Sequence, residues 1–185
     1  MTRTQAAAAL ALTIAASASA DEPIAGWDRA RWGMSSSDIK SAYPAATSPH
    51  KRDISDHSGR GELHCALELS DIRVGGCDFT VRFLMDSADR LAAVQLFKDF
   101  GKNRSDGHIA YLNVKELLIQ KHGTPTTDKE EKSSVPHVPS ADASSERSVW
   151  YGPNAKITFG YVSTPLIGLF WVVLTYAKPG DTERL

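Results

Sequence analysis

The chain has 185 residues, of which 42% are hydrophobic and 23% charged, and its formal net charge at pH 7 is −1. This length is sufficient for one hydrophobic core and does not require a second domain. Nucleic acids and anionic membranes favour proteins with clustered cations, so the near-neutral charge argues against both as partners.

The first twenty residues predict a secretory signal peptide. Arg3 precedes an alanine-rich apolar stretch, and Ala18, Ser19 and Ala20 supply the small residues that signal peptidase requires. The stretch is shorter than the roughly 20 apolar residues that span a bilayer, and no cysteine at the cleavage point could carry a lipid. We expect a soluble mature chain, residues 21–185, that is periplasmic or secreted and has no transmembrane segment. An uncleaved tail is the alternative.

The first half of the mature chain predicts one helix and three strands. Ser35 is expected to cap a short helix that ends at Pro44, with Asp38 completing a capping box. The polar stretch 45–61 predicts a loop. Apolar residues then alternate with polar ones over 63–69 and 77–85, and a third strand follows over 91–98.

The second half repeats this order. A helix is expected over about 108–122, ended by Gly123 and Pro125, and the serine-rich and charged segment of about 126–146 predicts a flexible loop. Strands follow over 147–151, 156–162 and 168–176. We therefore expect a single α+β domain made of two α-βββ repeats, about 27–100 and 107–178. Its antiparallel sheet would have about six strands, with both helices packed on one face.

The only two cysteines, Cys65 and Cys77, both fall on the apolar phase of neighbouring strands. Cysteine pairs in exported chains usually form disulfides, so this spacing predicts a Cys65–Cys77 bond. A metal site or a reactive thiol lacks supporting ligands at a useful spacing.

Three stretches carry a resemblance to known families: "WGMSSSDIKSAYP", "GGCDFTVRFLMDSADRLAAVQLF", and "LLIQKHGTP" followed by "SVWYGPNAKITFGYV". They resemble small exported bacterial proteins with BamE/SmpA-like or β-lactamase-inhibitor-protein-like modules, and also many uncharacterised periplasmic proteins. The resemblance implies an α-βββ fold and protein binding in the cell envelope, with no catalytic residues to carry over. The chain lacks the lipidation cysteine of the assembly lipoproteins.

A search for catalytic motifs is mostly negative. The sequence has no nucleophile elbow, phosphate loop, H-E-x-x-H motif or dinucleotide fingerprint, so we expect no catalytic residue, cofactor or metal. The rival hypothesis is a small metal-dependent hydrolase, because histidine and carboxylate groups suit zinc. Its site would consist of His57, His64, Asp53 and Asp56.

The strand alternation indicates a candidate binding surface. Trp171 and Phe97 fall on the phase opposite to the core residues of their strands, so they would lie on the face that the helices leave open. The residues expected there are Arg82, Gln95, Phe97, Thr158 and Trp171. Tryptophan and arginine are enriched in protein-binding hot spots. Alternatively, the long loops fold over this face and bury these side chains.

These observations favour an exported, non-enzymatic binding protein of the bacterial cell envelope. Its partner would be a protein or another envelope component, and an inhibitor of a secreted enzyme is the alternative within this class.

Overall fold

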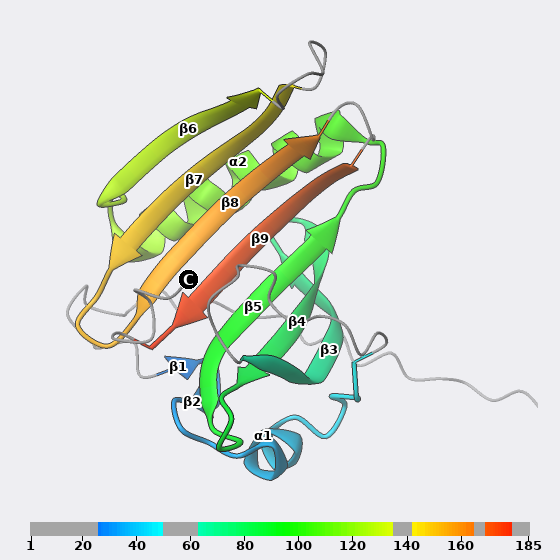
Figure 1. Cartoon of the computed structure of the whole chain (residues 1–185), viewed down its shortest axis with the longest axis vertical. Helices are drawn as coiled ribbons and strands as arrows, with labels where there is room; N and C mark the ends of the chain where they lie inside the picture. Colours follow the sequence, from blue (N-terminus) through cyan, green and yellow to red (C-terminus); the bar gives the residue numbers. More distant parts are fainter. Residues whose placement is uncertain (1–25, 50–62, 135–141, 165–168, 179–185) are drawn as a thin grey trace, which may run out of the picture.

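The computed structural model of the chain describes residues 26–49, 63–134, 142–164 and 169–178 (Figure 1). A small sheet holds β1 (Gly26–Trp27) and β2 (Ala30–Arg31), and a large antiparallel sheet has the strand order β3-β4-β5-β9-β8-β7-β6. Its strands are β3 (His64–Val74), β4 (Cys77–Met85), β5 (Leu91–Asp99), β6 (Thr127–Ser134), β7 (Asp142–Tyr151), β8 (Lys156–Thr164) and β9 (Leu169–Ala177). The helices are α1 (Ser36–Ala42) and α2 (Arg104–His122).

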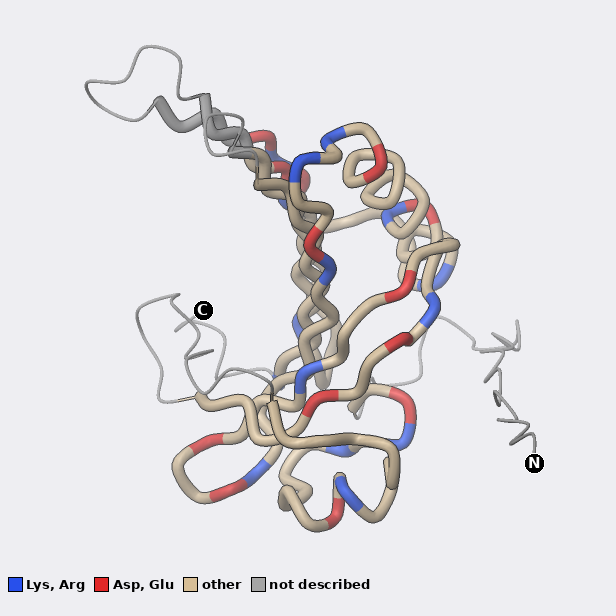
Figure 2. Tube along the Cα trace, turned by 90° about the vertical axis from the view of Figure 1, so that its right-hand side faces the viewer, with Lys and Arg blue, Asp and Glu red and all other residues tan. Residues whose placement is uncertain are grey.

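The expected α+β architecture, with a six-stranded sheet and both helices packed on one face, is wrong. The described chain is mostly β, and its large sheet has seven strands. Four strands follow α2, so the halves are not two equal α-βββ repeats. Only α2 lies across the large sheet, against β8 and β9, whereas the short α1 contacts β3 at one end of the sheet (Figures 1 and 2).

The additional strand comes from the segment expected to be a flexible loop, 126–146. Residues Thr127–Ser134 form β6, and β7 already begins at Asp142. The charged sequence of β6 does not alternate apolar and polar residues, because an edge strand needs only backbone pairing with its neighbour. Periodicity therefore could not reveal it.

The predicted helix ends were close to the observed ones. The Ser35 side chain accepts a hydrogen bond from the Asp38 backbone, and the Asp38 side chain accepts one from the Ser35 backbone, which confirms the capping box. Helix α2 begins four residues before the expected start, because the Asn103 side chain accepts the backbone N–H of Asp106. Gly123 caps its C-terminus. Neither described helix is long and apolar enough to cross a membrane.

One face of the large sheet forms the core. In β9, for example, Phe170, Val172, Leu174 and Tyr176 are buried, whereas the residues between them are partly exposed. Helix α2 adds Tyr111, whose ring stacks on that of Phe159 with centroids 5.0 Å apart. In Figure 1 this core side lies behind the strands, together with α2.

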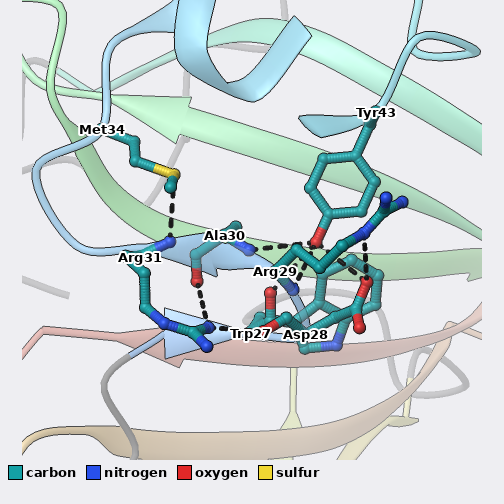
Figure 3. Close-up of polar contacts among 7 residues, drawn as sticks. All are labelled: Trp27, Asp28, Arg29, Ala30, Arg31, Met34 and Tyr43. Carbon is teal, nitrogen blue, oxygen red and sulfur yellow. Dashed lines mark hydrogen bonds and ion pairs between the residues drawn. The ribbon is translucent and has the colours of Figure 1, made fainter. Parts of the chain in front are cut away.

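Tyr43, the residue that caps the C-terminus of α1, links the small sheet to the core (Figure 3). Its hydroxyl accepts the backbone N–H groups of Arg29 and Ala30 at 2.9 and 3.0 Å, and donates to the Asp28 carboxylate at 3.0 Å. Its ring packs against Phe83, with centroids 5.1 Å apart. Burial raises the pKa of Tyr43 to about 12. The hydroxyl is therefore neutral near pH 7, and its role is structural.

The predicted Cys65–Cys77 disulfide is wrong, and both thiols are free. Gly75 and Gly76, both with positive φ, form the turn between β3 and β4, which places Val74 opposite Cys77. Cys65 lies opposite Leu84, at the other end of β4. At about 3.3 Å per residue the two cysteines are about 23 Å apart along the strands. They also lie on opposite faces of the sheet, because a register shift between Cys65 and Leu67 turns Cys65 toward Leu84, whereas Cys77 packs against the main core.

This separation predicts that the native protein keeps both thiols reduced. The protein is unfolded in guanidinium without reductant or alkylating agent and without oxygen, and its thiols are counted with Ellman's reagent. We expect two thiols per chain. Burial raises the pKa of Cys65 to about 11, so this thiol should react with Ellman's reagent in the folded protein far more slowly than after unfolding. A count near zero after unfolding would contradict the observed strand register.

Candidate functional site

The strand register places the five predicted binding residues on the same face of the large sheet, opposite to the core. Thr158 lies opposite Thr175, Thr175 opposite Gln95, and Gln95 opposite Arg82, so these residues form a row across four strands. Phe97 belongs to the next row, opposite Val173, and Trp171 to the row beyond it, opposite Asp99. We call this the open face. It is turned toward the viewer in Figure 1, with α2 behind it.

Arg82 is held by its neighbours on the open face. Its Nε lies 3.1 Å from the Glu68 carboxylate, its Nη1 donates to the Gln95 amide oxygen at 3.4 Å, and its Cζ lies 4.4 Å from the centroid of the Phe97 ring. The Arg82 and Glu68 side chains are only 14% and 10% exposed. Arg82 therefore acts mainly within the protein, where it supports Phe97 from one side.

The more accessible part of the open face is an apolar strip formed by Phe97, Val162, Trp171 and Val173. Phe97 lies opposite Val173, and Trp171 lies opposite Val162. All four are partly exposed. Gly160 lies opposite Val173 on β8 and places no side chain beside it. The four side chains thus form one contiguous surface from three neighbouring strands.

The predicted residues only partly coincide with this strip. Phe97 and Trp171 belong to it, whereas Thr158 lies in the polar row, and Arg82 is two strands and two rows from Trp171. With strands about 4.8 Å apart and rows about 6.6 Å apart, Arg82 and Trp171 are separated by roughly 16 Å. Val162 and Val173 were not predicted as site residues, because valine on the exposed phase of a strand gives no distinct signal.

A second candidate is a polar cleft of about 530 Å³ on the helix side of the sheet, at the start of α2. His108 Nε2 lies 3.2 Å from Glu146 Oε1, and the Tyr161 hydroxyl donates to the Arg104 carbonyl at 3.3 Å. The lining residues are Lys102, Asn103, Arg104, Ser105, His108, Glu130, Glu146 and Tyr161. The sequence predicted His108 only as the start of the helix and Glu146 as the end of the flexible loop, so it did not bring the two together.

The polar groups of this cleft mostly satisfy one another. The Ser105 hydroxyl donates to the Asn103 side chain at 3.0 Å rather than to His108, so the serine and histidine are not arranged as a nucleophile and its base. Burial also raises the pKa of Tyr161, which keeps its hydroxyl protonated. The geometry supports a structural link between α2 and β7 better than it supports catalysis.

Only one of the four residues of the hydrolase hypothesis, His64, lies in the part of the chain that the structure describes. His57, Asp53 and Asp56 lie outside the described residues, and His64 is an exposed residue at the start of β3. Within residues 26–49, 63–134, 142–164 and 169–178, no group of three or more His, Cys, Asp or Glu side chains could hold a metal ion.

No protein-family model matches the chain, and no curated protein or solved structure is significantly similar to it. The resemblance to BamE/SmpA-like and β-lactamase-inhibitor-protein-like modules therefore stays a prediction.

The Glu68–Arg82 pair yields a stability prediction. Glu68→Gln would leave the nearly buried Arg82 cation without its counterion, and we expect the free energy of unfolding to fall by about 3 kcal/mol. The double variant Glu68→Leu/Arg82→Met removes both charges and should recover most of this loss. Urea denaturation followed by circular dichroism measures both values. Equal stability of Glu68→Gln and the wild type would show that the pair does not hold Arg82.

Proposed function

We propose that this chain is an exported, non-enzymatic binding protein of the bacterial cell envelope, and that the apolar strip on the open face contacts its partner. The observation that carries the proposal is the adjacency of two aromatic and two valine side chains on the sheet face opposite α2. Contiguous, partly exposed apolar surfaces of this kind are typical of interaction sites.

The geometry of the strip suits a protein partner. The residues of the strip belong to paired strands, so their backbone is fixed before binding. Binding therefore costs little backbone conformational entropy. The Arg82 guanidinium packs on one side of the Phe97 ring and restrains it further. Trp171 supplies a large, rigid contact, and tryptophan is among the residues most enriched in binding hot spots.

Two other functions predict different properties of the purified protein. An inhibitor of a secreted enzyme would use the same strip and would lower the activity of its target on stoichiometric addition. A metal-dependent hydrolase would instead contain stoichiometric zinc, which elemental analysis of the purified protein measures.

Export predicts a defined N-terminus. Expressed from its full sequence in a bacterium with a periplasm, the protein should be recovered by osmotic shock, and its N-terminal sequence should begin at Asp21. A matched variant, Ala18→Glu/Ala20→Glu, should stay unprocessed because signal peptidase requires small residues there. Recovery of the wild-type chain in the cytoplasm with residues 1–20 intact would contradict export.

The strip predicts a strong dependence of binding on Trp171. Proteins recovered from an envelope extract by the wild-type chain are purified, and the Kd of each is measured by titration calorimetry. Trp171→Ala should raise the Kd about thirtyfold, equivalent to about 2 kcal/mol for a hot-spot tryptophan. Leu112→Ala, which truncates an exposed side chain on α2, should leave the Kd unchanged within twofold. Equal Kd values for Trp171→Ala and the wild type would remove the strip from the proposal.

A further inference from the structure

Two cations face each other on the open face, beside the apolar strip. Lys129 of β6 lies directly opposite Arg147 of β7, and both side chains are exposed. Arg147 in turn lies opposite Gly160, which lies opposite Val173 of the strip. We call Lys129 and Arg147 the cation pair.

No side chain that the structure describes forms an ion pair with Lys129 or Arg147; the side chains of 131–134 and 142–144 on the same two strands lie outside that description. The ion pairs found among the described side chains involve neither Lys129 nor Arg147. Like charges directly opposite each other destabilise a strand pair. Burial lowers the pKa of Lys156, and the positive charge of Arg147 lowers it further. The positive potential of Arg147 therefore extends to Lys156 on this part of the face.

The other face of the same two strands shows the contrast. There Glu130 lies directly opposite Glu146, which is again a like-charge pair. On that side, however, the protein supplies a partner of its own, because His108 Nε2 lies 3.2 Å from the Glu146 carboxylate. The helix that provides this partner covers only one side of the sheet, so no group from α2 meets the cation pair.

The cation pair and the strip are in line. Lys129, Arg147, Gly160, Val173 and Phe97 occupy consecutive strands in one row across the sheet. At about 4.8 Å per strand, Arg147 and Val173 are about 10 Å apart and the whole row is about 19 Å long. Because Gly160 has no side chain, nothing from β8 rises between the two parts. One ligand could contact both.

We infer that the partner presents an acidic polypeptide segment, whose carboxylates pair with Lys129 and Arg147 while its apolar side chains cover Phe97, Val173 and Trp171. This inference rests on the proposed function and adds the charge and orientation of the partner. Ten ångströms is about three residues of extended chain or two turns of helix, so one short segment can supply both groups. An anionic bilayer fits less well, since each surface cation contributes only about 1 kcal/mol and two are too few for stable attachment.

A charge-swap selection tests the inference. A random dodecapeptide library displayed on phage is selected on the mature wild-type protein and on Lys129→Glu/Arg147→Glu. The control, Lys102→Glu/Lys121→Glu, makes the same change in net charge at exposed positions off the open face. We expect the wild type and the control to enrich peptides that contain Asp or Glu with apolar residues, and the swapped variant to enrich Lys and Arg instead. Circular dichroism confirms that each variant is folded.

The other outcomes separate this inference from the proposed function. If the wild type selects peptides that Trp171→Ala no longer selects, but their acidic content equals that of the library, the strip binds protein and the inference fails. If the wild type selects nothing, or the same peptides as Trp171→Ala, both fail. Binding of phosphatidylglycerol vesicles that is lost in Lys129→Glu/Arg147→Glu, without enrichment of acidic peptides, would assign the cation pair to a lipid headgroup and overturn the inference.

Discussion

The pairing of β5 with β9 is the constraint on which the rest of the structure depends. It joins the β3-β4-β5 meander to the β9-β8-β7-β6 meander and sets which side of each faces the core. Leu96 lies opposite Leu174 on the core side, and Phe97 lies opposite Val173 on the open face. A slip of one residue would exchange these faces, exposing the leucines and burying the strip and its polar row. The core and the candidate site are therefore fixed by the same set of backbone hydrogen bonds.

Helix covers one face of the large sheet and not the other, and this follows from the apolar residues that each helix carries. The buried side of α2 is dominated by Tyr111, Val114 and Leu118, which pack onto β8 and β9, whereas α1 has only seven residues and a single buried one, Ile39. One long helix can cover one side of the central strands and no more. The like-charge pairs of β6 and β7 reflect this difference, since only the acidic pair faces α2 and meets its histidine.

Alternation in the sequence predicted which residues share a face where the strands are regular, but it predicted neither the irregularity at Cys65 nor the positions of residues along the strands. It placed Arg82, Gln95 and Phe97 together correctly, because side-chain parity is a local property. The disulfide prediction failed for two reasons. The Gly75-Gly76 turn sets Cys65 and Cys77 at opposite ends of the hairpin, and a register shift between Cys65 and Leu67 puts them on opposite faces of the sheet. β6 and the His108–Glu146 contact were missed for a related reason. Both depend on partners that are distant in the sequence.

The edges of the large sheet bear on how a partner could approach. Adding a strand to a sheet requires a regular, unpaired edge. β3 has two register irregularities, a positive φ at Asp71 and a backbone bridge from Thr47, so part of its outer edge is distorted or already paired. β6, the other edge, carries a run of charged residues, which opposes pairing with a further strand. Contact through side chains on the open face avoids both obstacles, and this favours the apolar strip and the adjacent cation pair as the place where a partner binds.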